Sequence, residues 1–537
     1  MPIHSPLGRV TEPDKNFALY LCSLLHKNTE RNSKKLAVFD SRRNVSLTFN
    51  QLLLCIRTLA ERLRAMDGFN FQTTALLVAP NCPEFAIVCL ACAAAGIVVS
   101  TANPNSTTLE LQRQLIDCEA SSIFAMSSLM PNVMRIAIAI SLEKSTKHAM
   151  IVMDLDLDLS VTEEATMGVA SVTYYLIKLL DNSSSASCDV VVSDNFDWIA
   201  REPTSKTVLM PYSSGTTGLP KGVMLSSRNS VAQIVMKLSS VRQNMFPNFD
   251  PPLIDFFDET FVIATPFYHI MGFINLLFSL TCGVTVVTVA RYQPTDYFRL
   301  IQTYRPRFLS LVPPMAVHLA KHARVSEFDL SSVQIMLVGA APLKREVENA
   351  LKETLPRLRH VMHGWGMSEM TAGITYGGIG PPGNTGQLLP NTVCKVNETK
   401  ICCFGQLGEL CIKSPCLMTG YWRRPHTTNE VIDNDGFLHS GDLGYYNENG
   451  FIFIVDRLKE LIKVKGFQVA PAELEGILLG HAKVADAAVI GVAANDVTIG
   501  EVPLALVVPK TGTHIKEREL HDFVNGMVQF WLLVNKT

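Results

Sequence analysis

The sequence lacks an excess of charge of either sign. Its 537 residues carry 47 Lys and Arg against 49 Asp and Glu, which gives a net charge of −2. Nucleic acids and anionic membranes attract proteins through a strong positive field, so neither is an expected partner. Any anionic ligand must instead be bound by a few local groups.

Paired cysteines and a secretion signal are also lacking. The 13 cysteines are scattered, and Cys402-Cys403, Cys411 and Cys416 do not follow the spacing of zinc sites. The first residues show no charged start followed by an apolar stretch. We therefore expect an intracellular, cytoplasmic protein, or a peroxisomal one if its native C-terminus carries a targeting tail.

No apolar run has the character of a membrane span. Phe85–Val99 is shorter than the roughly 20 residues that a bilayer requires, and its small residues suit a buried helix. Ile270–Ala290 is long enough, but Gly283 divides it into a Leu/Phe-rich half and a β-branched half. This pattern predicts a helix, a turn and a buried strand rather than a transmembrane segment.

Helical and β-branched segments alternate along the chain. Phe49–Leu63 has a helical pattern, and Thr48 with Gln51 offers a capping box at its start. Thr73–Val78 is strand-like, and such alternation is typical of parallel sheets covered by helices. Further strands are expected at Phe308–Val312, Ile335–Val338 and Phe404–Ile412, and a loop at Asp181–Asp194.

The chain is longer than one ordinary domain of roughly 100–200 residues. We predict an α/β fold with a large multi-sheet N-terminal region, residues 1–456, whose helices pack on the sheets. Residues 457–537 would form a small mobile α+β domain. Its expected elements are a helix at Ala472–Leu479 and a strand pair at Ala487–Val492 and Val502–Val508.

The most specific motif runs from Tyr212 to Val223. Its glycines let backbone N–H groups approach a polyphosphate, its hydroxyls add donors, and Lys221 adds a mobile positive charge. The spacing is not that of a Walker A loop. The motif predicts a phosphate-binding loop, with a plain hydroxyl-rich turn as the alternative. The candidate ligands are Ser213, Ser214, Gly215, Thr216, Thr217, Gly218 and Lys221.

This motif and several later ones resemble, in order, those of the acyl-adenylate-forming superfamily. Gly339-Ala340-Ala341-Pro342 resembles the family's loop under the adenine and acyl group, and residues 363–369 resemble its nucleotide-binding signature. The likeness is to 4-coumarate:CoA ligases and luciferase-like acyl-CoA synthetases, and it extends along nearly the whole chain. Further matching segments are Gly408-Glu409-Leu410, Gly420-Tyr421-Trp422, residues 439–445 and residues 456–468.

The resemblance implies ATP, CoA and Mg²⁺ as ligands beside a small-molecule carboxylic acid. Attack of a carboxylate on an α-phosphate brings two anions together, so the site needs cations and oriented donors. Lys221, Arg457 and Lys463 are the cationic candidates, and Glu369 resembles the family's Mg²⁺ ligand. Asp442 would accept the ribose hydroxyls, although alone it would also suit an ordinary turn. The remaining nucleotide-site residues are Gly339, His363, Gly364, Trp365 and Ser368.

The thioester step is assigned by resemblance to a second set of residues. His269 resembles the family histidine between the acyl pocket and the pantetheine tunnel, whereas a lone histidine beside aromatics is more often a core residue. Lys459 resembles the hinge of the small domain, with a surface lysine in a charged turn as the alternative. Lys465 and Gly466 would face CoA.

Two departures from the family bear on activity. Met271 stands where plant coumarate ligases tend to have Tyr, which leaves a flexible apolar wall and makes fatty acids as well suited as hydroxycinnamates. No Pro-Ser-Gly-Lys-like segment follows Glu519, although its lysine serves adenylation in the family. We expect the resemblance to stop near Val524 and the small domain to be incomplete, through a splice variant, a retained intron or a gene-model error.

Two other patterns do not predict chemistry. Gly378–Gly383 satisfies G-x-G-x-x-G, but its prolines disfavour the helix that a dinucleotide site requires, so we expect a loop. His360 and His363 lack a third ligand at metal spacing.

The function predicted from these features is the AMP-forming ligation of a fatty or aromatic acid to CoA through an acyl-adenylate. A catalytically impaired or non-catalytic nucleotide- or acyl-binding form is the alternative, favoured only by the missing lysine segment. A luciferase-like oxygenase is a third reading, which no residue specifically supports. The acid and the oligomeric state stay open.

Overall fold

The computed structural model describes residues 2–66, 69, 71–144, 148–156, 171–180, 196–213, 220–402, 405–458, 460, 462–464, 467–469, 471–493, 501–510 and 512–525. The chain separates into two compact units. Unit 1 comprises residues 1–3, 393–413 and 431–537, and unit 2 comprises residues 4–392 and 414–430. The domain division expected after Asp456 stays a prediction.

The largest sheet of unit 2 is parallel through its centre and carries an antiparallel hairpin at one end. Its strands pair in the order β10-β11-β9-β5-β4-β6-β7-β8, and β21 pairs with β11. Buried, β-branched strands of this kind suit a parallel sheet covered by helices. The strands are β4 (Thr74–Val78), β5 (Val98–Ala102), β6 (Ala120–Ala125), β7 (His148–Val152), β8 (Ser171–Tyr175), β9 (Thr207–Leu209), β10 (Tyr212–Ser213), β11 (Lys221–Ser226) and β21 (Gly420–Tyr421).

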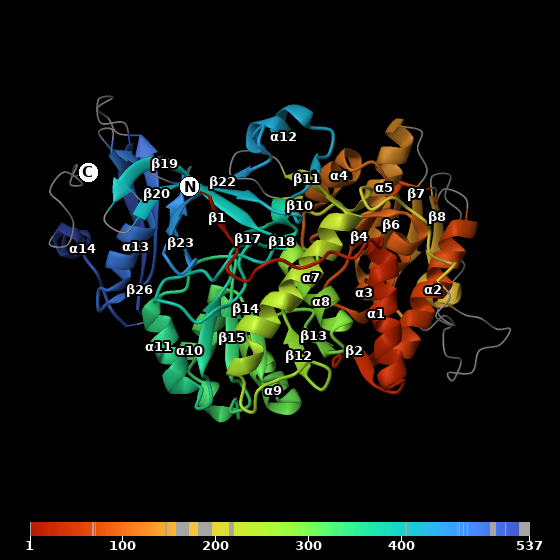
Figure 1. Cartoon of the computed structure of the whole chain (residues 1–537), viewed down its shortest axis with the longest axis horizontal. Helices are drawn as coiled ribbons and strands as arrows, with labels where there is room; N and C mark the ends of the chain where they lie inside the picture. The colour runs from red at the N-terminus through yellow and green to blue at the C-terminus, as the bar shows by residue number, and fades with distance from the viewer. Residues whose placement is uncertain are drawn as a thin grey trace. The chain divides into compact units, whose positions relative to one another are not determined.

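Three helices near the N-terminus, α1, α2 and α3, pack side by side in unit 2 (Figure 1). Thr48 caps α2, and both bonds of the expected capping box with Gln51 are present. The buried helix expected in Phe85–Val99 is α3, which ends at Ala95 because Gly96 turns the chain with φ 83°. The helices of this part of the chain are α1 (Phe17–Arg31), α2 (Phe49–Ala65), α3 (Pro83–Ala95), α4 (Thr108–Asp117), α5 (Met130–Lys144) and α6 (Leu176–Leu180).

Two smaller sheets of unit 2 have three or four strands. One has the order β12-β13-β2-β3 and the other the order β14-β15-β16. The expected helix, turn and strand of Ile270–Ala290 are confirmed as α8 and β13, joined at Gly283 with φ 76°. The strands are β2 (Leu36–Asp40), β3 (Val45–Thr48), β12 (Thr260–Ile263), β13 (Thr285–Thr288), β14 (Phe308–Leu311), β15 (Ile335–Val338) and β16 (His360–His363). The helices are α7 (Ser227–Asn244), α8 (Ile270–Thr281), α9 (Pro294–Tyr304), α10 (Pro313–Lys321), α11 (Arg345–Thr354) and α12 (Pro425–Val431).

Unit 1 contains an antiparallel sheet in which β19, β20, β22 and β23 are successive neighbours. After it, helices α13 and α14 cover the hairpin of β26 and β27, with Leu474, Leu478 and Val489 in a small core. The expected elements of this region are thus confirmed. Its elements are β19 (Val393–Cys402), β20 (Gly405–Lys413), β22 (Leu438–Tyr446), β23 (Ile452–Arg457), β24 (Ile462–Val464), β25 (Phe467–Val469), α13 (Pro471–Leu479), β26 (Val484–Ala493), β27 (Glu501–Pro509) and α14 (Glu517–Asn525).

The architecture confirms a multi-sheet α/β fold with helices packed on the sheets. The Gly378–Gly383 stretch is a loop, as expected. The Asp181–Asp194 segment lies outside the described residues. None of the helices described is both long enough and apolar enough to cross a bilayer. Short strands also form at β1 (Ile3–His4), β17 (Gly366–Met367) and β18 (Ala372–Gly373).

Candidate active site

The predicted phosphate loop joins the two strands of a hairpin. Ser213 on β10 lies opposite Lys221 on β11, so the two ends of the loop that joins them are neighbours in the sheet. The hydroxyl of Ser213 is buried and has no hydrogen-bond partner within the described ranges, which leaves it available to a ligand. The other predicted ligands, Ser214, Gly215, Thr216, Thr217 and Gly218, lie outside the described residues.

Lys221 and the candidate metal ligand Glu369 meet at Tyr421. The Lys221 ammonium lies 4.9 Å from the centre of the Tyr421 ring, within cation–π range. The Tyr421 hydroxyl donates a 2.9 Å hydrogen bond to Oε1 of Glu369. Burial, and then the charge of Glu369, raise the pKa of this tyrosine, so it stays a donor at physiological pH.

The pairing of β21 with β11 places Tyr421 opposite Val223, two residues beyond Lys221. The sequence motif contained Tyr421, but no role was assigned to it. Pairing between segments about 200 residues apart in the chain creates the contact, so local sequence patterns could not reveal it.

A tight hairpin sets the backbone of Ser368 and Glu369. Gly366 on β17 faces β18 so closely that a Cβ would lie 1.8 Å from the carbonyl oxygen of Ala372. Thr371 and Ala372 both have positive φ, 54° and 98°. Non-glycine residues pay for this conformation, and such strain often accumulates at functional sites. The backbone oxygen of Glu369 also accepts a 2.8 Å bond from the Met418 N–H.

The predicted adenine-side residues follow the carboxyl ends of β15 and β16. These strands are parallel, with Val338 opposite His363, so Gly339 and Gly364 emerge next to each other. A Cβ on Gly339 would lie 3.4 Å from the Gly364 carbonyl oxygen and 3.5 Å from the Met271 methyl group. Ligands of parallel sheets bind at this edge. Gly339, Gly364 and the predicted acyl-pocket residue Met271 are therefore brought together.

His363 and Trp365 are held by specific contacts on either side of Gly364. A ring nitrogen of His363, Nε2, lies 2.7 Å from Oε1 of Glu348 on α11. The backbone N–H of Trp365 donates a 2.9 Å hydrogen bond to the Thr375 hydroxyl, and the Trp365 side chain is buried. The His363 ring is thus held by a side-chain contact, whereas the hydrogen bond of Trp365 holds its backbone.

His269 precedes the first turn of α8. Its ring centre lies 4.5 Å from that of Tyr268, and the Tyr268 carbonyl accepts a 2.7 Å bond from the Thr101 hydroxyl. The ring reaches solvent, yet desolvation by surrounding protein atoms lowers its pKa, so the imidazole is neutral at neutral pH. It is therefore not a simple core histidine.

In unit 1, Asp442 and Arg457 lie directly opposite each other on β22 and β23. The guanidinium Nε of Arg457 is 3.4 Å from Oδ1 of Asp442, whose side chain is 7% exposed, while Arg457 is exposed. The strand register accounts for the spacing of these two residues in the sequence. Of the other candidates, Lys463 lies on β24 opposite Gln468, and Lys459, Lys465 and Gly466 lie outside the described residues.

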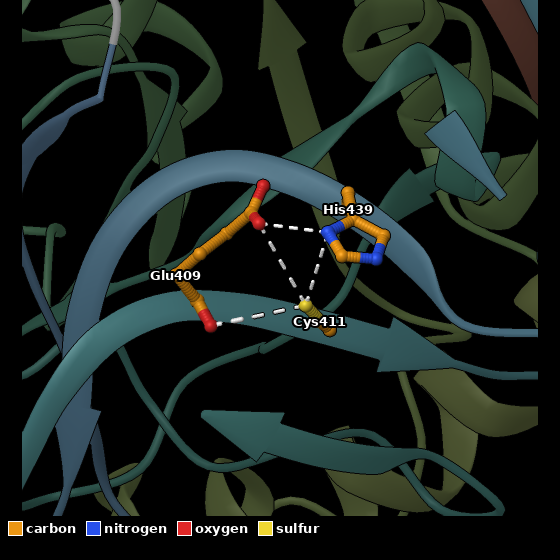
Figure 2. A group of neighbouring side chains, drawn as sticks. All are labelled: Glu409, Cys411 and His439. Atoms are coloured by element: carbon orange, nitrogen blue, oxygen red, sulfur yellow. Dashed lines mark hydrogen bonds and ion pairs between the residues drawn. The ribbon is translucent and has the colours of Figure 1, made fainter. Parts of the chain in front are cut away.

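A cluster that sequence reasoning missed lies on β20 and β22, close in sequence to Asp442 (Figure 2). Glu409 and Cys411 on β20 face His439 on β22, and Oε2 of Glu409 lies 2.7 Å from Nδ1 of His439. The other carboxylate oxygen accepts a 3.0 Å bond from the Gly441 N–H. One carboxylate thereby contacts two positions of β22 shortly before Asp442, where the pairing register with β20 shifts. The three ligand atoms lie within 4.8 Å of one another, a group the cysteine spacing did not suggest.

Comparison with known proteins matches two family models. The model described as AMP-binding enzyme matches residues 25–422, and the AMP-binding enzyme C-terminal domain matches residues 473–536. The second match extends beyond Val524, where we expected the resemblance to stop.

Curated relatives and solved structures agree with this assignment. The chain is 35% identical to "Probable 4-coumarate--CoA ligase 1" of Dictyostelium discoideum, over 84% of this chain and 79% of the relative. It is 30% identical to "Peroxisomal OPC-8:0-CoA ligase 1" of Arabidopsis thaliana, over 99% and 91%. The fold is similar to that of ATP-bound MatB from Rhodopseudomonas palustris, with a TM-score of 0.75, 22% identity, and 95% and 93% of the two chains covered. This chain belongs to the AMP-binding enzyme family and is a 4-coumarate–CoA ligase-like member of it.

Proposed function

We propose that this chain ligates a carboxylic acid to CoA, consuming ATP and releasing AMP and pyrophosphate through an acyl-adenylate. The observation that carries the proposal is the contact of Lys221, Tyr421 and Glu369 at the base of the phosphate loop. A cation, a hydroxyl donor and a carboxylate next to a polyphosphate loop are the groups that phosphoryl chemistry requires.

In the first half-reaction, an oxygen of the acid attacks the α-phosphorus and pyrophosphate leaves. Lys221 and the loop would hold the polyphosphate, and the Asp442 carboxylate would accept hydrogen bonds from the ribose hydroxyls. Arg457 and Lys463 would reduce the repulsion between the two anions. Holding the reactants in this orientation lowers the barrier because the entropy of aligning them is lost on binding and not in the reaction step.

Glu369 has the properties expected of a magnesium ligand. One carboxylate oxygen accepts from Tyr421, while the described residues provide no donor for the other, Oε2. Hard carboxylate oxygens suit Mg²⁺, which commonly binds through one or two carboxylates plus phosphate oxygens. A bound Mg²⁺ would neutralise charge on the leaving pyrophosphate.

In the second half-reaction, the CoA sulfur attacks the acyl carbon and AMP leaves. A neutral His269 at the start of α8 could receive a thiol proton. Lys465 and Gly466 would face CoA, and Lys459 would act as the hinge of a small mobile domain, residues 457–537. The domain division after residue 456 belongs to this proposal.

The test is to measure AMP, pyrophosphate and acyl-CoA with a panel of fatty and aromatic acids. We expect AMP to form only when acid and CoA are both present, in equal amount to the thioester. Glu369→Gln should reduce this rate by roughly 100-fold. Glu327→Gln, at a surface ion pair with Arg324, is the matched control and should not change it. ATP binding without acid-dependent turnover would contradict the proposal.

An impaired or non-catalytic nucleotide-binding form is the alternative. Exchange of pyrophosphate into ATP, driven by the free acid, isolates adenylation from thioester formation and decides between the two. The compartment is proposed to be the cytoplasm, or the peroxisome as for the Arabidopsis relative.

A further inference from the structure

A lysine is buried in unit 2 without an acidic partner. Lys237 on α7 is 2% exposed. Its ammonium donates a 2.6 Å hydrogen bond to Oδ1 of Asn275 on α8. It also lies 4.5 Å from the ring centre of Phe278 and 4.6 Å from that of Tyr376. Throughout the described part of the chain, no carboxylate forms an ion pair with it or raises its pKa.

This arrangement costs stability unless something else compensates for it. Buried charges in proteins are normally paired with an opposite charge. Burial lowers the pKa of Lys237 to about 7, and the nearby Cys282 only partly opposes this. A methionine or leucine could pack α7 against α8 without the cost. A buried titratable group of this kind, with no evident structural need, is a candidate for ligand binding.

The position of Lys237 points to the acyl group as the ligand. Met271 contacts position 339, where the acyl group and adenine are expected to meet. Asn275 is four residues further along α8, on the same face and about 6 Å deeper along the helix axis. Its Nδ2 donates a 3.1 Å bond to the Ser310 hydroxyl on β14. Polar groups therefore continue inward from the apolar Met271.

The Met271 side chain can move aside to let an acyl chain reach Asn275. It is half-buried, and methionine has three rotatable bonds that let it adapt to a ligand. An acyl chain that passes Met271 would meet Asn275 and the ammonium of Lys237 at its far end.

We propose that Lys237, oriented by Asn275, binds a second carboxylate at the far end of the acyl substrate, so that the preferred acids are dicarboxylic. The proposal rests on the proposed ligase function and narrows its substrate class. An aliphatic or phenolic end would leave the ammonium unpaired, whereas a carboxylate would supply the missing counter-charge. Lys237 is thus a specificity residue that takes no part in the bond-forming steps.

The test compares acids of equal length with and without the second carboxylate, beginning with octanedioate and octanoate and including shorter and longer pairs. For wild-type protein, kcat/KM should favour the diacid. Lys237→Met should lower kcat/KM for the diacid by about 30-fold, the usual effect of losing a charged hydrogen bond, and leave the monoacid within a few fold. Arg242→Met removes an exposed charge from the same helix and should change kcat/KM for neither the diacid nor the monoacid.

If Lys237 had a purely structural role, its substitution would change kcat/KM for the diacid and for the monoacid by the same factor. Equal changes for both acids, or a wild-type enzyme that activates only monoacids at every length, would overturn the proposal. Lys237→Gln replaces Lys237→Met if the latter does not fold.

Titration calorimetry separates this proposal from the ligase proposal. Octanedioate binding in two buffers of different ionisation enthalpy should show proton uptake by wild-type protein and none by Lys237→Met. Proton uptake without turnover would sink only the ligase proposal. Binding without Lys237-dependent proton uptake would sink the second-carboxylate site.

Discussion

The stability of Lys237→Met should depend on pH in a way that identifies a buried ammonium. In unliganded wild-type protein, Lys237 has a pKa of about 7 against an ordinary value of 10.5. The folded pKa is the lower one, so between these values the unfolded chain holds more protons. Wild-type stability therefore rises with pH through this window, and the full penalty is present below pH 7.

The magnitude follows from the same two values. Their difference corresponds to about 5 kcal/mol at low pH. Methionine removes this penalty but leaves Oδ1 of Asn275 without its donor, which costs about 2 kcal/mol. The variant should then be more stable than wild type by about 3 kcal/mol at pH 6, and the difference should approach zero near pH 9. Tyr376 and Cys282 have pKa values raised by burial and do not titrate in this range.

The assay is urea unfolding of both proteins and of Arg242→Met at several pH values between 6 and 9, compared as differences from wild type. Comparing differences limits the error that separate unfolding of the two units would introduce. A difference that stays constant with pH, or a methionine variant that is the less stable at every pH, would show that no buried ammonium carries this cost.

Three further outcomes concern the reaction itself. Asp442→Ala should reduce acid-driven pyrophosphate exchange by roughly 100- to 1,000-fold, since a preorganised partner is lost, and an unchanged rate would remove Asp442 from the site. Tyr421→Phe should raise the Mg²⁺ concentration needed for half-maximal rate, because Glu369 loses an orienting donor, and an unchanged requirement would assign the tyrosine to packing alone. Met271→Tyr should shift kcat/KM towards hydroxylated aromatic acids over monocarboxylic fatty acids, and identical ratios in both proteins would refute that placement.

Local signals in the sequence predicted local structure well. The capping box of Thr48 and Gln51 marks the start of α2, and Gly283 marks the turn between α8 and β13. Each feature depends on residues within a few positions, where backbone preference dominates. The strand expected at Ile335–Val338 also ends where predicted, because turn residues beginning at Gly339 follow it. The ends of the Tyr212–Val223 motif, expected to be loop, instead lie on β10 and β11.

Contacts between distant segments were beyond such reasoning. Tyr421 reaches Glu369 only through the pairing of β21 with β11, and Glu409 reaches His439 only through the register of β20 and β22. In the sequence, Lys237 is an ordinary polar residue in a helical pattern. Its burial is not predictable locally because it depends on contacts with α8 and Tyr376. Strand register and helix packing are tertiary properties that single-segment patterns do not encode.

The order in which the chain visits its two units has a consequence for synthesis. After residues 1–3, which belong to unit 1, the polypeptide forms unit 2 through residue 392. It contributes residues 393–413 to unit 1, returns to unit 2 for residues 414–430, and continues in unit 1 from residue 431. Domains tend to fold as they emerge from the ribosome, N-terminal part first. Here β11 can pair with β21, and β20 with β22, only after the later strand of each pair has been synthesised. A protein shortened at residue 392 would expose the open edge of β11 and lack Tyr421, so Glu369 gains its hydroxyl donor only late in translation.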